Sequence, residues 1–538
     1  MLKRIMVLAL ALCTAAGFLP VLAAGPGARL DTHQIILRLK DDGVRRMQAV
    51  RHNEVVPDIR LPDGSPLTFV RQFDGNGIVV RLPQAVTYEQ AEQIAARLVA
   101  DPSVASAQAD KRMYPALIPL DPGYLPGTAL PGGVLSNQWN LFEDTGGIRM
   151  QSGWNLETGS VTGVIAQLDT GFLPHRDIDP ARILPGYDFF SGGPSNLVPA
   201  TELDNDTILG DPVGRDNNPT DPGDATVNDE CETGMLGNNS SWHGLSVASV
   251  MVAESNNNTD IAGIDFAARL LPVRVLGKCG GSVLDVADAL RWAAGLSVAG
   301  VPVNPTPARV INMSLSGAGS CTPEEQSAID AVVDVGAIVI VSAGNDGGDV
   351  AGQSPANCKK VVVVGATLRD GSRAPYTNSG GGITLSAPGG LTQQQPANGI
   401  LVLSNSGATT PAQDINARIA GSSFSTAQVS ATASLMLAVN SALSASQVRD
   451  ILRLTTRMFP DASCDTSSCG SGILDADAAL AGAADPSSVL GVKANTGGGG
   501  CTVALATTSG FDPVFWLLMV FSAWRCRPGR IRVFVPRR

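Results

Sequence analysis

Apolar runs of strand length alternate with helical patterns between residues 137 and 485, and this alternation constrains the fold more than any other feature. The strand-like runs are mostly apolar throughout and lie at 163–168, 270–276, 310–313, 337–341 and 361–364. Helical patterns separate or follow them at 243–253, 283–294, 323–335, 423–438 and 445–454. Strands without a polar side must be covered on both sides. The pattern therefore predicts an α/β fold, a mostly parallel sheet with helices on both faces, whose chemistry gathers at the carboxyl ends of the strands.

A different pattern precedes this region. Residues 25–118 carry short strand patterns at 35–40, 78–82 and 104–108 and an amphipathic helical pattern at 88–100. These features predict a small α+β domain ahead of the larger one. Residues 119–136 are rich in proline, which is typical of an extended, exposed linker where proteases cut.

Both ends of the chain carry targeting features. Residues 1–24 read as a signal peptide, because Lys3 and Arg4 precede a short apolar run and Ala23–Ala24 offers a cleavage site. At the other end, a Gly-rich linker at 486–500 leads to a tail at 501–538. The tail joins a short apolar segment to an Arg-rich end, and the apolar part is too short to span a bilayer. This order resembles sorting tails that Gram-negative bacteria recognise and remove; transient contact with a membrane surface is the alternative. We expect a secreted protein, either in the periplasm or outside the cell or on the cell surface of a Gram-negative bacterium.

Charge and cysteine content limit the binding partners and the cellular compartment that the chain is suited to. The net charge of −11 disfavours nucleic acid as a partner, and four histidines are too few for a multi-histidine metal site. Outside the signal peptide and tail, the even number of cysteines in an exported chain suggests three disulfides. Fifteen pairings are open to six cysteines, and the short loop between Cys464 and Cys469 makes that pair the easiest to propose. The six are Cys231, Cys279, Cys321, Cys358, Cys464 and Cys469.

Three short segments place reactive side chains where this fold positions a site. Asp169 ends an apolar strand before a glycine turn, His243 opens an apolar helix, and Ser423 opens a long Ala-rich helix. Each alone has a structural reading: a turn aspartate, a buried histidine or an N-cap serine. In the order Asp, His, Ser they match one known order of a nucleophilic triad. His175 is a competing base, but its Pro- and Asp-rich turn has no helical pattern, so we favour His243.

These segments resemble the subtilisin-like serine proteases (subtilases), above all the disulfide-containing extracellular subtilases of Gram-negative bacteria. The resemblance covers 137–485, and residues 25–118 resemble the inhibitory propeptide of that family. Four further stretches support it, namely 274–277 (RVLG), 310–315 (VINMSL), 341–345 (VSAGN) and 385–389 (LSAPG).

The resemblance implies a secreted serine endopeptidase that is made as a self-processed zymogen. Ser423 would attack the peptide carbonyl, His243 would act as base and then acid, and Asp169 would orient the histidine. Asn345 would donate its amide to the oxyanion. No organic cofactor is implied.

Substrate would bind as an added strand, because backbone pairing tolerates many side-chain sequences. By resemblance, the residues that bind it are Leu276, Gly277, Gly281, Ser314, Leu315, Ser316 and Gly344. They imply a roomy apolar pocket and broad specificity. Four residues at three places depart from the family pattern: Leu245-Ser246 stands for Thr-His, Ala427 for Pro, and Ser316 for the first Gly of Leu-Gly-Gly.

A polar insertion at 191–242 is rich in Asp, Asn, Gly and Pro. Hard oxygen ligands in such a loop suit Ca²⁺, and similar proteases bind Ca²⁺ in a comparable insertion. Asp211 and Asp216 are the candidate ligands. A solvated acidic loop explains the same residues, and the sequence leaves both interpretations open.

Two other functions compete with the endopeptidase. One is a surface binding protein on a catalytically degenerate subtilase scaffold, which the intact Asp169, His243, Asn345 and Ser423 argue against. The other is an esterase of the α/β-hydrolase type. That fold requires Gly-x-Ser-x-Gly and the order Ser, acid, His, and residues 421–425 (GSSFS) lack the second glycine.

Overall fold

The computed structural model describes residues 31–40, 54–61, 64–73, 75–110, 118–192, 214–393 and 395–491. The predicted signal peptide (1–24) and C-terminal tail (501–538) lie outside these residues. Among the described residues, no helix is both long enough and apolar enough to cross a membrane.

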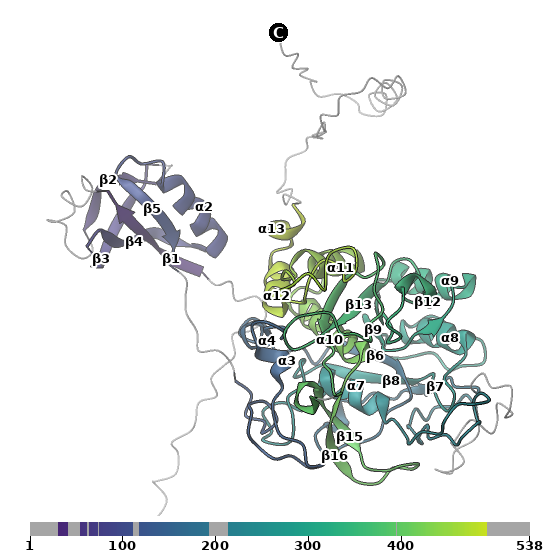
Figure 1. Ribbon diagram of the computed structural model, residues 1–538. Coiled ribbons are helices and arrows are strands. Elements are labelled where there is room, and N and C mark those ends of the chain that lie inside the picture. Colours follow the sequence, from purple (N-terminus) through teal and green to yellow (C-terminus); the bar gives the residue numbers. More distant parts are fainter. Residues whose placement is uncertain are drawn as a thin grey trace, which may run out of the picture. The chain divides into compact units, whose positions relative to one another are not determined.

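The N-terminal part is an antiparallel sheet with one helix against it (Figure 1). Its sheet has the order β2-β3-β4-β1-β5. The elements are β1 (Asp31–Leu39), β2 (Val55–Arg60), β3 (Pro66–Phe73), β4 (Gly77–Thr87), α2 (Tyr88–Leu98) and β5 (Val104–Ala109). Ile35 and Leu37 of β1 and Ala91 and Ala95 of α2 are fully buried in one core. Three strands and the helix lie where the sequence predicts them; β2 and β3 were not predicted. That this part is a propeptide stays a prediction.

A seven-stranded parallel sheet, in the order β14-β13-β11-β9-β6-β8-β7, forms the centre of the larger part. Every neighbouring pair is parallel, so the predicted fold class is confirmed. The strands are β6 (Val164–Asp169), β7 (Tyr187–Asp188), β8 (Arg269–Arg274), β9 (Val310–Met313), β11 (Ile338–Ser342), β13 (Val362–Thr367) and β14 (Leu385–Pro388). β7 and β14 were not predicted, because β7 is short and β14 contains Ser386 and Pro388.

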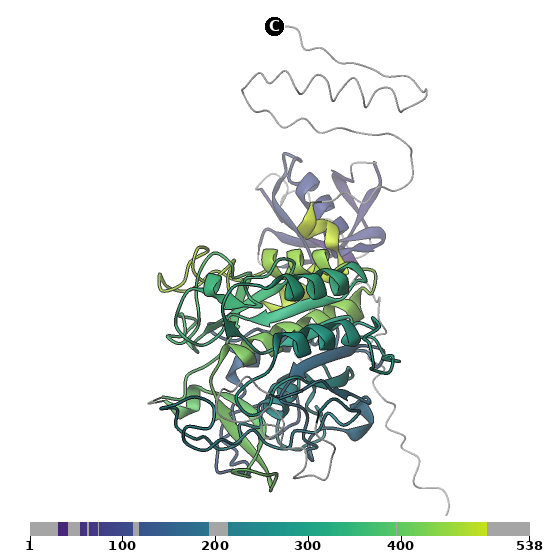
Figure 2. The ribbon, with the colours of Figure 1, turned by 90° about the vertical axis from the view of Figure 1, so that its right-hand side faces the viewer.

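Helices cover both faces of this sheet (Figure 1), and the side that carries α8 and α9 faces the viewer in Figure 2. Successive side chains of a strand point to opposite faces. Accordingly, Ile340 packs in the core with α7 (His243–Val252) and α10 (Ser422–Val439), while Val339 and Val341 pack with α8 (Val283–Ala293) and α9 (Pro323–Asp334). This division explains why the strands carry no polar side. α11 (Ala445–Leu454) and α12 (Ala476–Ala484) join the α7–α10 side.

Smaller elements complete the domain, and sequence patterns did not predict them. Two antiparallel pairs lie outside the main sheet: β10 (Gly317–Ala318) with β12 (Gln353–Ser354), and β15 (Ile400–Asn405) with β16 (Asp414–Ile419). The short helices are α3 (Trp139–Phe142), α4 (Met150–Gly153), α13 (Pro486–Leu490) and the 3₁₀ turns Pro180–Arg182, Val350–Gly352 and Pro396–Asn398.

Helix starts differ in a way that matters for the site. α9 and α11 begin with complete capping boxes, Thr322 with Glu325 and Ser444 with Gln447. A side-chain cap of this kind satisfies amide groups that the helix itself leaves unpaired. α7 and α10 have no side-chain cap at Trp242 or Gly421. The first turns of these two helices, which carry His243 and Ser423, are therefore held by other parts of the molecule.

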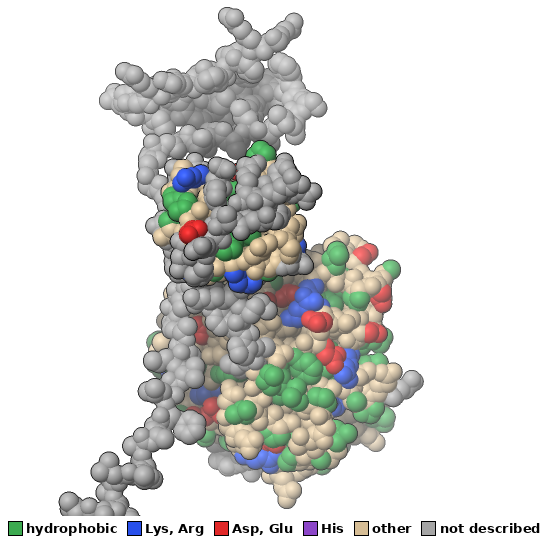
Figure 3. Space-filling model, turned by 90° about the vertical axis from the view of Figure 1, so that its left-hand side faces the viewer, with side chains coloured by type: hydrophobic (Ala, Val, Ile, Leu, Met, Phe, Trp, Pro, Cys, Tyr) green, Lys and Arg blue, Asp and Glu red, His purple; other side chains and the backbone are tan. Residues whose placement is uncertain are grey.

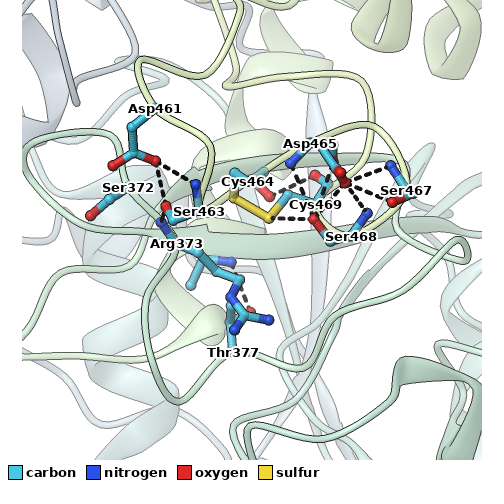
Figure 4. Close-up of a disulfide and its surroundings, with 12 residues drawn as sticks. Ser372, Arg373, Thr377, Asp461, Ser463, Cys464, Asp465, Ser467, Ser468 and Cys469 are labelled. Atoms are coloured by element: carbon cyan, nitrogen blue, oxygen red, sulfur yellow. Dashed lines mark hydrogen bonds between the residues drawn. A yellow bond between two sulfur atoms is a disulfide. The ribbon is translucent and has the colours of Figure 1, made fainter.

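Among the described residues the cysteines form three disulfides, as the cysteine count suggested: Cys231–Cys279, Cys321–Cys358 and Cys464–Cys469. The last is the pair that the short loop favoured. Inside that loop, Asp465 Oδ1 accepts hydrogen bonds from the amides and hydroxyls of Ser467 and Ser468 (Figure 4). Asp461 holds the preceding turn in the same way through Ser463. On the face drawn in Figure 3, hydrophobic side chains are scattered among polar ones.

Candidate active site

Asp169 is the last residue of β6, and only 1% of it is exposed. Its Oδ1 accepts a hydrogen bond from the amide of Thr170 at 2.8 Å and lies 2.6 Å from His243 Nδ1. A buried carboxylate in this position fixes the imidazole tautomer with the proton on Nδ1, which leaves Nε2 as the basic nitrogen.

His243 is the first residue of α7, and a quarter of its side chain (26%) is exposed. Burial lowers the pKa of His243, but the charge and hydrogen bond of Asp169, with the charges of Asp224 and Asp221, outweigh it and leave the pKa raised. The charge that raises the pKa is the one that would stabilise an imidazolium during proton transfer.

Ser423 lies in the first turn of α10 and is 5% exposed. Its hydroxyl donates to Ser314 O at 3.2 Å, while Ser314 Oγ donates to Ser423 O at 2.9 Å. In this resting arrangement the hydroxyl bonds Ser314 rather than His243. Catalytic hydrogen bonds are often completed only when substrate binds. His243 and Ser423 line the same cavity.

Asn345 follows β11 and has an exposed side chain. Its Oδ1 accepts hydrogen bonds from the amide and the hydroxyl of Ser422, both at 2.9 Å. Because these bonds fix the oxygen end of the amide, the Nδ2 donors are turned away from Ser422, and Asn345 lines the cavity with Ser423. Sequence reasoning missed Ser422. Its position directly before Ser423 was the available signal.

The cavity has a volume of about 680 Å³ and contains most of the predicted substrate residues. Leu276, Gly277, Gly281, Ser314, Leu315 and Ser316 all line it. Apolar Val283 and Val286 and polar Thr322 and Glu325 were not predicted to line it. They come from the starts of α8 and α9.

Gly344 differs from the expectation. It is buried, with a φ of +92°, and is not among the residues that line the cavity. A Cβ at this position would lie 2.5 Å from Asn378 Nδ2 and 2.9 Å from Ser316 Oγ. Glycine therefore lets the chain turn between β11 and Asn345, and the cavity wall is made by nearby Ser342 instead.

Apart from Gly344, the predicted substrate-binding residues fall in two segments, 276–281 and 314–316, and these segments differ in their backbone pairing. Residues 276–281 form no strand, and only Gly277 and Gly280 bridge each other. Ser314–Ser316 follow β9 directly, but Gly317 is already paired with Ser354 through β10 and β12. Backbone groups before Gly317 are thus better placed to meet an extended peptide.

Of the two predicted metal ligands, Asp211 lies outside the described residues. Asp216 Oδ1 accepts from Asn218 N at 2.7 Å, and Asp216 Oδ2 is buried with no hydrogen-bond partner among the described residues. A second oxygen-rich place is the loop 256–261, where Asp121 and Asp177 accept its backbone amides. Desolvation raises the pKa of the fully buried Asp177 to about 8.

One cluster among the described residues has metal-ligand spacing, Cys321, Glu325 and Cys358, but its two sulfur atoms form a disulfide. The competing base His175 is buried, and its Nδ1 accepts from Asp177 N at 3.2 Å. It does not line the cavity. The preference for His243 therefore agrees with the geometry.

Comparison with known proteins fits this geometry. A profile described as "Subtilase family" (Peptidase_S8) matches residues 162–501, more than half of the chain. The chain belongs to the subtilase family. The match includes Asp169, His243, Asn345 and Ser423, which stand at the ends of four different elements of the subtilase sheet and its helices.

Two similar curated proteins come from Gram-negative bacteria. An "Extracellular protease" of Xanthomonas campestris is 40% identical over 418 residues, 78% of this subtilase and 66% of the relative. An "Extracellular basic protease" of Dichelobacter nodosus is 34% identical over 425 residues, 78% of this chain and 64% of the relative. The chain thus spans just under two thirds of the length of each.

A solved structure supports the fold. A protease structure from Pseudoalteromonas arctica is 43% identical, with a TM-score of 0.59. The match covers 64% of this subtilase and 97% of that chain. The parallel sheet with helices on both faces is therefore a subtilisin-like fold.

Proposed function

We propose that this subtilase is a secreted serine endopeptidase that hydrolyses peptide bonds through an acyl-enzyme on Ser423. The observation that carries the proposal is the buried Asp169 carboxylate 2.6 Å from His243 Nδ1, with Ser423 on the same cavity. A serine hydroxyl is a weak nucleophile without an adjacent base, and this arrangement supplies one. The extracellular proteases among the relatives support secretion.

In the proposed reaction, His243 Nε2 takes the proton from Ser423 Oγ as the oxygen attacks the peptide carbonyl. Asp169 stabilises the resulting imidazolium and keeps its ring oriented. His243 then gives the proton to the leaving amine, so that the C–N bond breaks and the acyl group stays on Ser423. Water, deprotonated by His243, hydrolyses the ester and restores the serine.

The negative charge of the tetrahedral intermediate would be stabilised by Asn345 Nδ2 and by the amide of Ser423 at the start of α10. Fixed donors at the developing oxyanion cost no reorganisation during the reaction. The positive end of the helix dipole adds to this stabilisation. The bonds from Ser422 to Asn345 Oδ1 support the role because they hold the donor in place before substrate arrives.

The proposed specificity is broad. Small residues and backbone make up much of the cavity wall, and Leu276, Leu315 and Val283 add apolar surface. Backbone pairing along Ser314–Ser316 would bind peptides of many sequences. Residues 25–118 would act as an intramolecular inhibitor until cleavage between about residues 110 and 137 releases them; the small α+β architecture of that part supports this.

The proposal includes a Ca²⁺ ion in the 191–242 insertion. Its support is the buried Asp216 Oδ2, which has no hydrogen-bond partner among the described residues. A carboxylate oxygen is a ligand that Ca²⁺ prefers. The ion would stabilise the insertion and would take no part in the chemical steps.

The decisive experiment compares the wild-type chain with Ser423→Ala, both secreted into an oxidising compartment. We expect only the wild type to lose about a hundred N-terminal residues by intact mass, to cleave a protein substrate, and to be labelled by a fluorophosphonate. Loss of the nucleophile in subtilisins lowers the rate about 10⁶-fold, and we expect a loss of that order here.

The alternative, a binding protein on a degenerate scaffold, predicts a different result. A folded wild-type chain that neither matures, cleaves nor reacts with the fluorophosphonate would overturn the enzyme proposal. Equal processing of both forms would show that another protease removes the N-terminal residues, and the fluorophosphonate label would then decide whether Ser423 is reactive.

A further inference from the structure

Asp221 is a buried carboxylate that the proposed chemistry does not use. It belongs to the polar insertion, yet it is 1% exposed and lies against the turn that follows β6. The amide of Asp221 donates to Phe172 O at 3.1 Å, and the neighbouring Thr220 forms an isolated parallel β-bridge with Phe172. The insertion thus places the Asp221 carboxylate next to the turn that follows Asp169 at the end of β6.

Thr170 connects this carboxylate to both triad segments. Its hydroxyl donates to Asp221 Oδ2 at 2.7 Å, and the same Oγ1 accepts from Gly244 N at 3.0 Å. Its amide donates to Asp169 Oδ1 at 2.8 Å. One residue therefore binds the triad carboxylate through its backbone and the first turn of α7 through its side chain.

The first turn of α7 needs such a partner. Trp242 supplies no side-chain cap, so the amide of Gly244, next to His243, depends on Thr170 Oγ1. The first turn of α7 packs tightly against the turn that follows β6, because a Cβ added to Gly244 would lie 1.9 Å from Gly171 O. Because the Thr170 hydroxyl donates its hydrogen bond to Asp221, a lone pair of Thr170 Oγ1 faces the amide of Gly244.

We propose that Asp221 is a positioning residue of the triad: it orients the Thr170 hydroxyl, which in turn holds the first turn of α7 and sets His243 on Asp169. This inference rests on the proposed function. A hydroxyl without a fixed acceptor rotates among its staggered positions, so loss of Asp221 would leave His243 less firmly placed. A small misplacement of a catalytic group lowers the rate strongly.

The charges around the two groups agree with this role. Burial raises the pKa of Asp221 to about 7, and the charge of nearby Asp224 raises it as well. The hydrogen bonds from Thr170 and Gly223 and the charge of Arg274 lower this pKa. Around His243, burial lowers the pKa, whereas Asp169, Asp224 and Asp221 raise it. Removing the Asp221 charge therefore shifts His243 toward the neutral form at a given pH.

The test is a double-mutant cycle on the whole secreted chain with Asp221→Ala, Thr170→Val and both together. Fluorophosphonate titration counts active sites, and kcat and KM are measured on a chromogenic tetrapeptide anilide. We expect each single change to lower kcat about 10- to 100-fold with little change in KM. We expect the double variant to be no worse than the worse single variant, because both changes break one chain of contacts. Thr170→Ser, which keeps the hydroxyl, should recover most of the loss of Thr170→Val.

The pH profile separates this role from a merely structural one. In Asp221→Ala the acid limb of kcat/KM should move to lower pH, because the Asp221 charge raises the pKa of His243. In Thr170→Val it should move in the same direction by less, because loss of the Thr170 bond raises the pKa of Asp221 and so reduces its charge. Asp229→Ala is the control for loss of a carboxylate elsewhere in the insertion, because among the described residues Asp229 bonds Gly234 and Met235 of the same insertion. Additive losses in the cycle, or a fall in stability with unchanged kcat per titrated site, would overturn the inference. An inactive but folded wild type would instead overturn the proposed function, and this inference with it.

Discussion

Ser422 holds the side chain of Asn345, the proposed oxyanion donor. The two bonds that Ser422 makes to Asn345 Oδ1 fix which end of the amide faces the cavity. Only the hydroxyl bond depends on the Ser422 side chain, since the other comes from the backbone. The contribution of Ser422 should therefore be smaller than that of Asn345 itself.

We expect Asn345→Ala to lower kcat by about 10²–10³, the loss established for an oxyanion donor in subtilisins. Ser422→Ala should lower kcat by about tenfold, the effect of roughly one hydrogen bond, with KM nearly unchanged. Steady-state kinetics on a peptide anilide measure both. An effect of Ser422→Ala on KM alone would contradict the positioning argument.

The raised pKa of His243 predicts the pH dependence of the reaction. The histidine must be neutral to accept the serine proton, so activity is lost as pH falls through its folded pKa, above the ordinary 6.5. Asp224 raises this pKa and bonds Ser241 rather than the triad. Asp224→Asn should move the acid limb of kcat/KM to lower pH. An unchanged limb would show that Asp224 does not act on His243.

At the scale of elements, the site depends on what precedes and follows each strand and helix. β6 delivers Asp169, β9 delivers Ser314 and β11 delivers Asn345, all at carboxyl ends, while α7 and α10 bring His243 and Ser423 at their first turns. The disulfide Cys321–Cys358 joins the residue before the α9 capping box to the segment that follows β12. It thus supports one wall of the cavity.

Removing Cys321–Cys358 by serine substitution should lower the free energy of unfolding by up to about 4 kcal/mol, given its 37-residue separation. Cys464–Cys469 provides the comparison within the same chain, and with its separation of 5 residues it should cost about 2 kcal/mol. Denaturant unfolding of Ser423→Ala backgrounds, which avoids self-digestion, measures both. Equal losses would show that native contacts rather than loop length determine the effect.

At the scale of the whole molecule, the proposed Ca²⁺ ion links the insertion to overall stability. An ion that binds only the folded chain stabilises it by mass action. Adding a chelator to Ser423→Ala should lower the Tm, and Ca²⁺ should restore it while Mg²⁺ restores it less. Asp216→Ala should remove most of the Ca²⁺ response. A Tm that does not respond to chelator or Ca²⁺ would contradict the calcium proposal.

The sequence by itself determined the fold class and pointed to the residues of the proposed triad. Continuous apolar strands can be buried only between two helical layers, and Asp169, His243 and Ser423 each stand where such a strand ends or a helix begins. Cys464 and Cys469 were similarly constrained by their short loop. β7, β10 and β12 escaped prediction because two-residue strands carry too few residues to show a period, and β14 because Ser386 and Pro388 interrupt its apolar run.

Only the tertiary structure decided which distant groups support those residues. Thr170, Asp221 and Gly244 come together because a polar insertion without periodicity folds back on the end of β6. The exclusion of Gly344 from the cavity, the hold of Ser422 on Asn345 and the pairing of Cys231 with Cys279 are likewise long-range. The physical reason is that periodicity records which side of an element is buried, whereas a hydrogen bond or disulfide between distant segments depends on where the folded backbone places both partners.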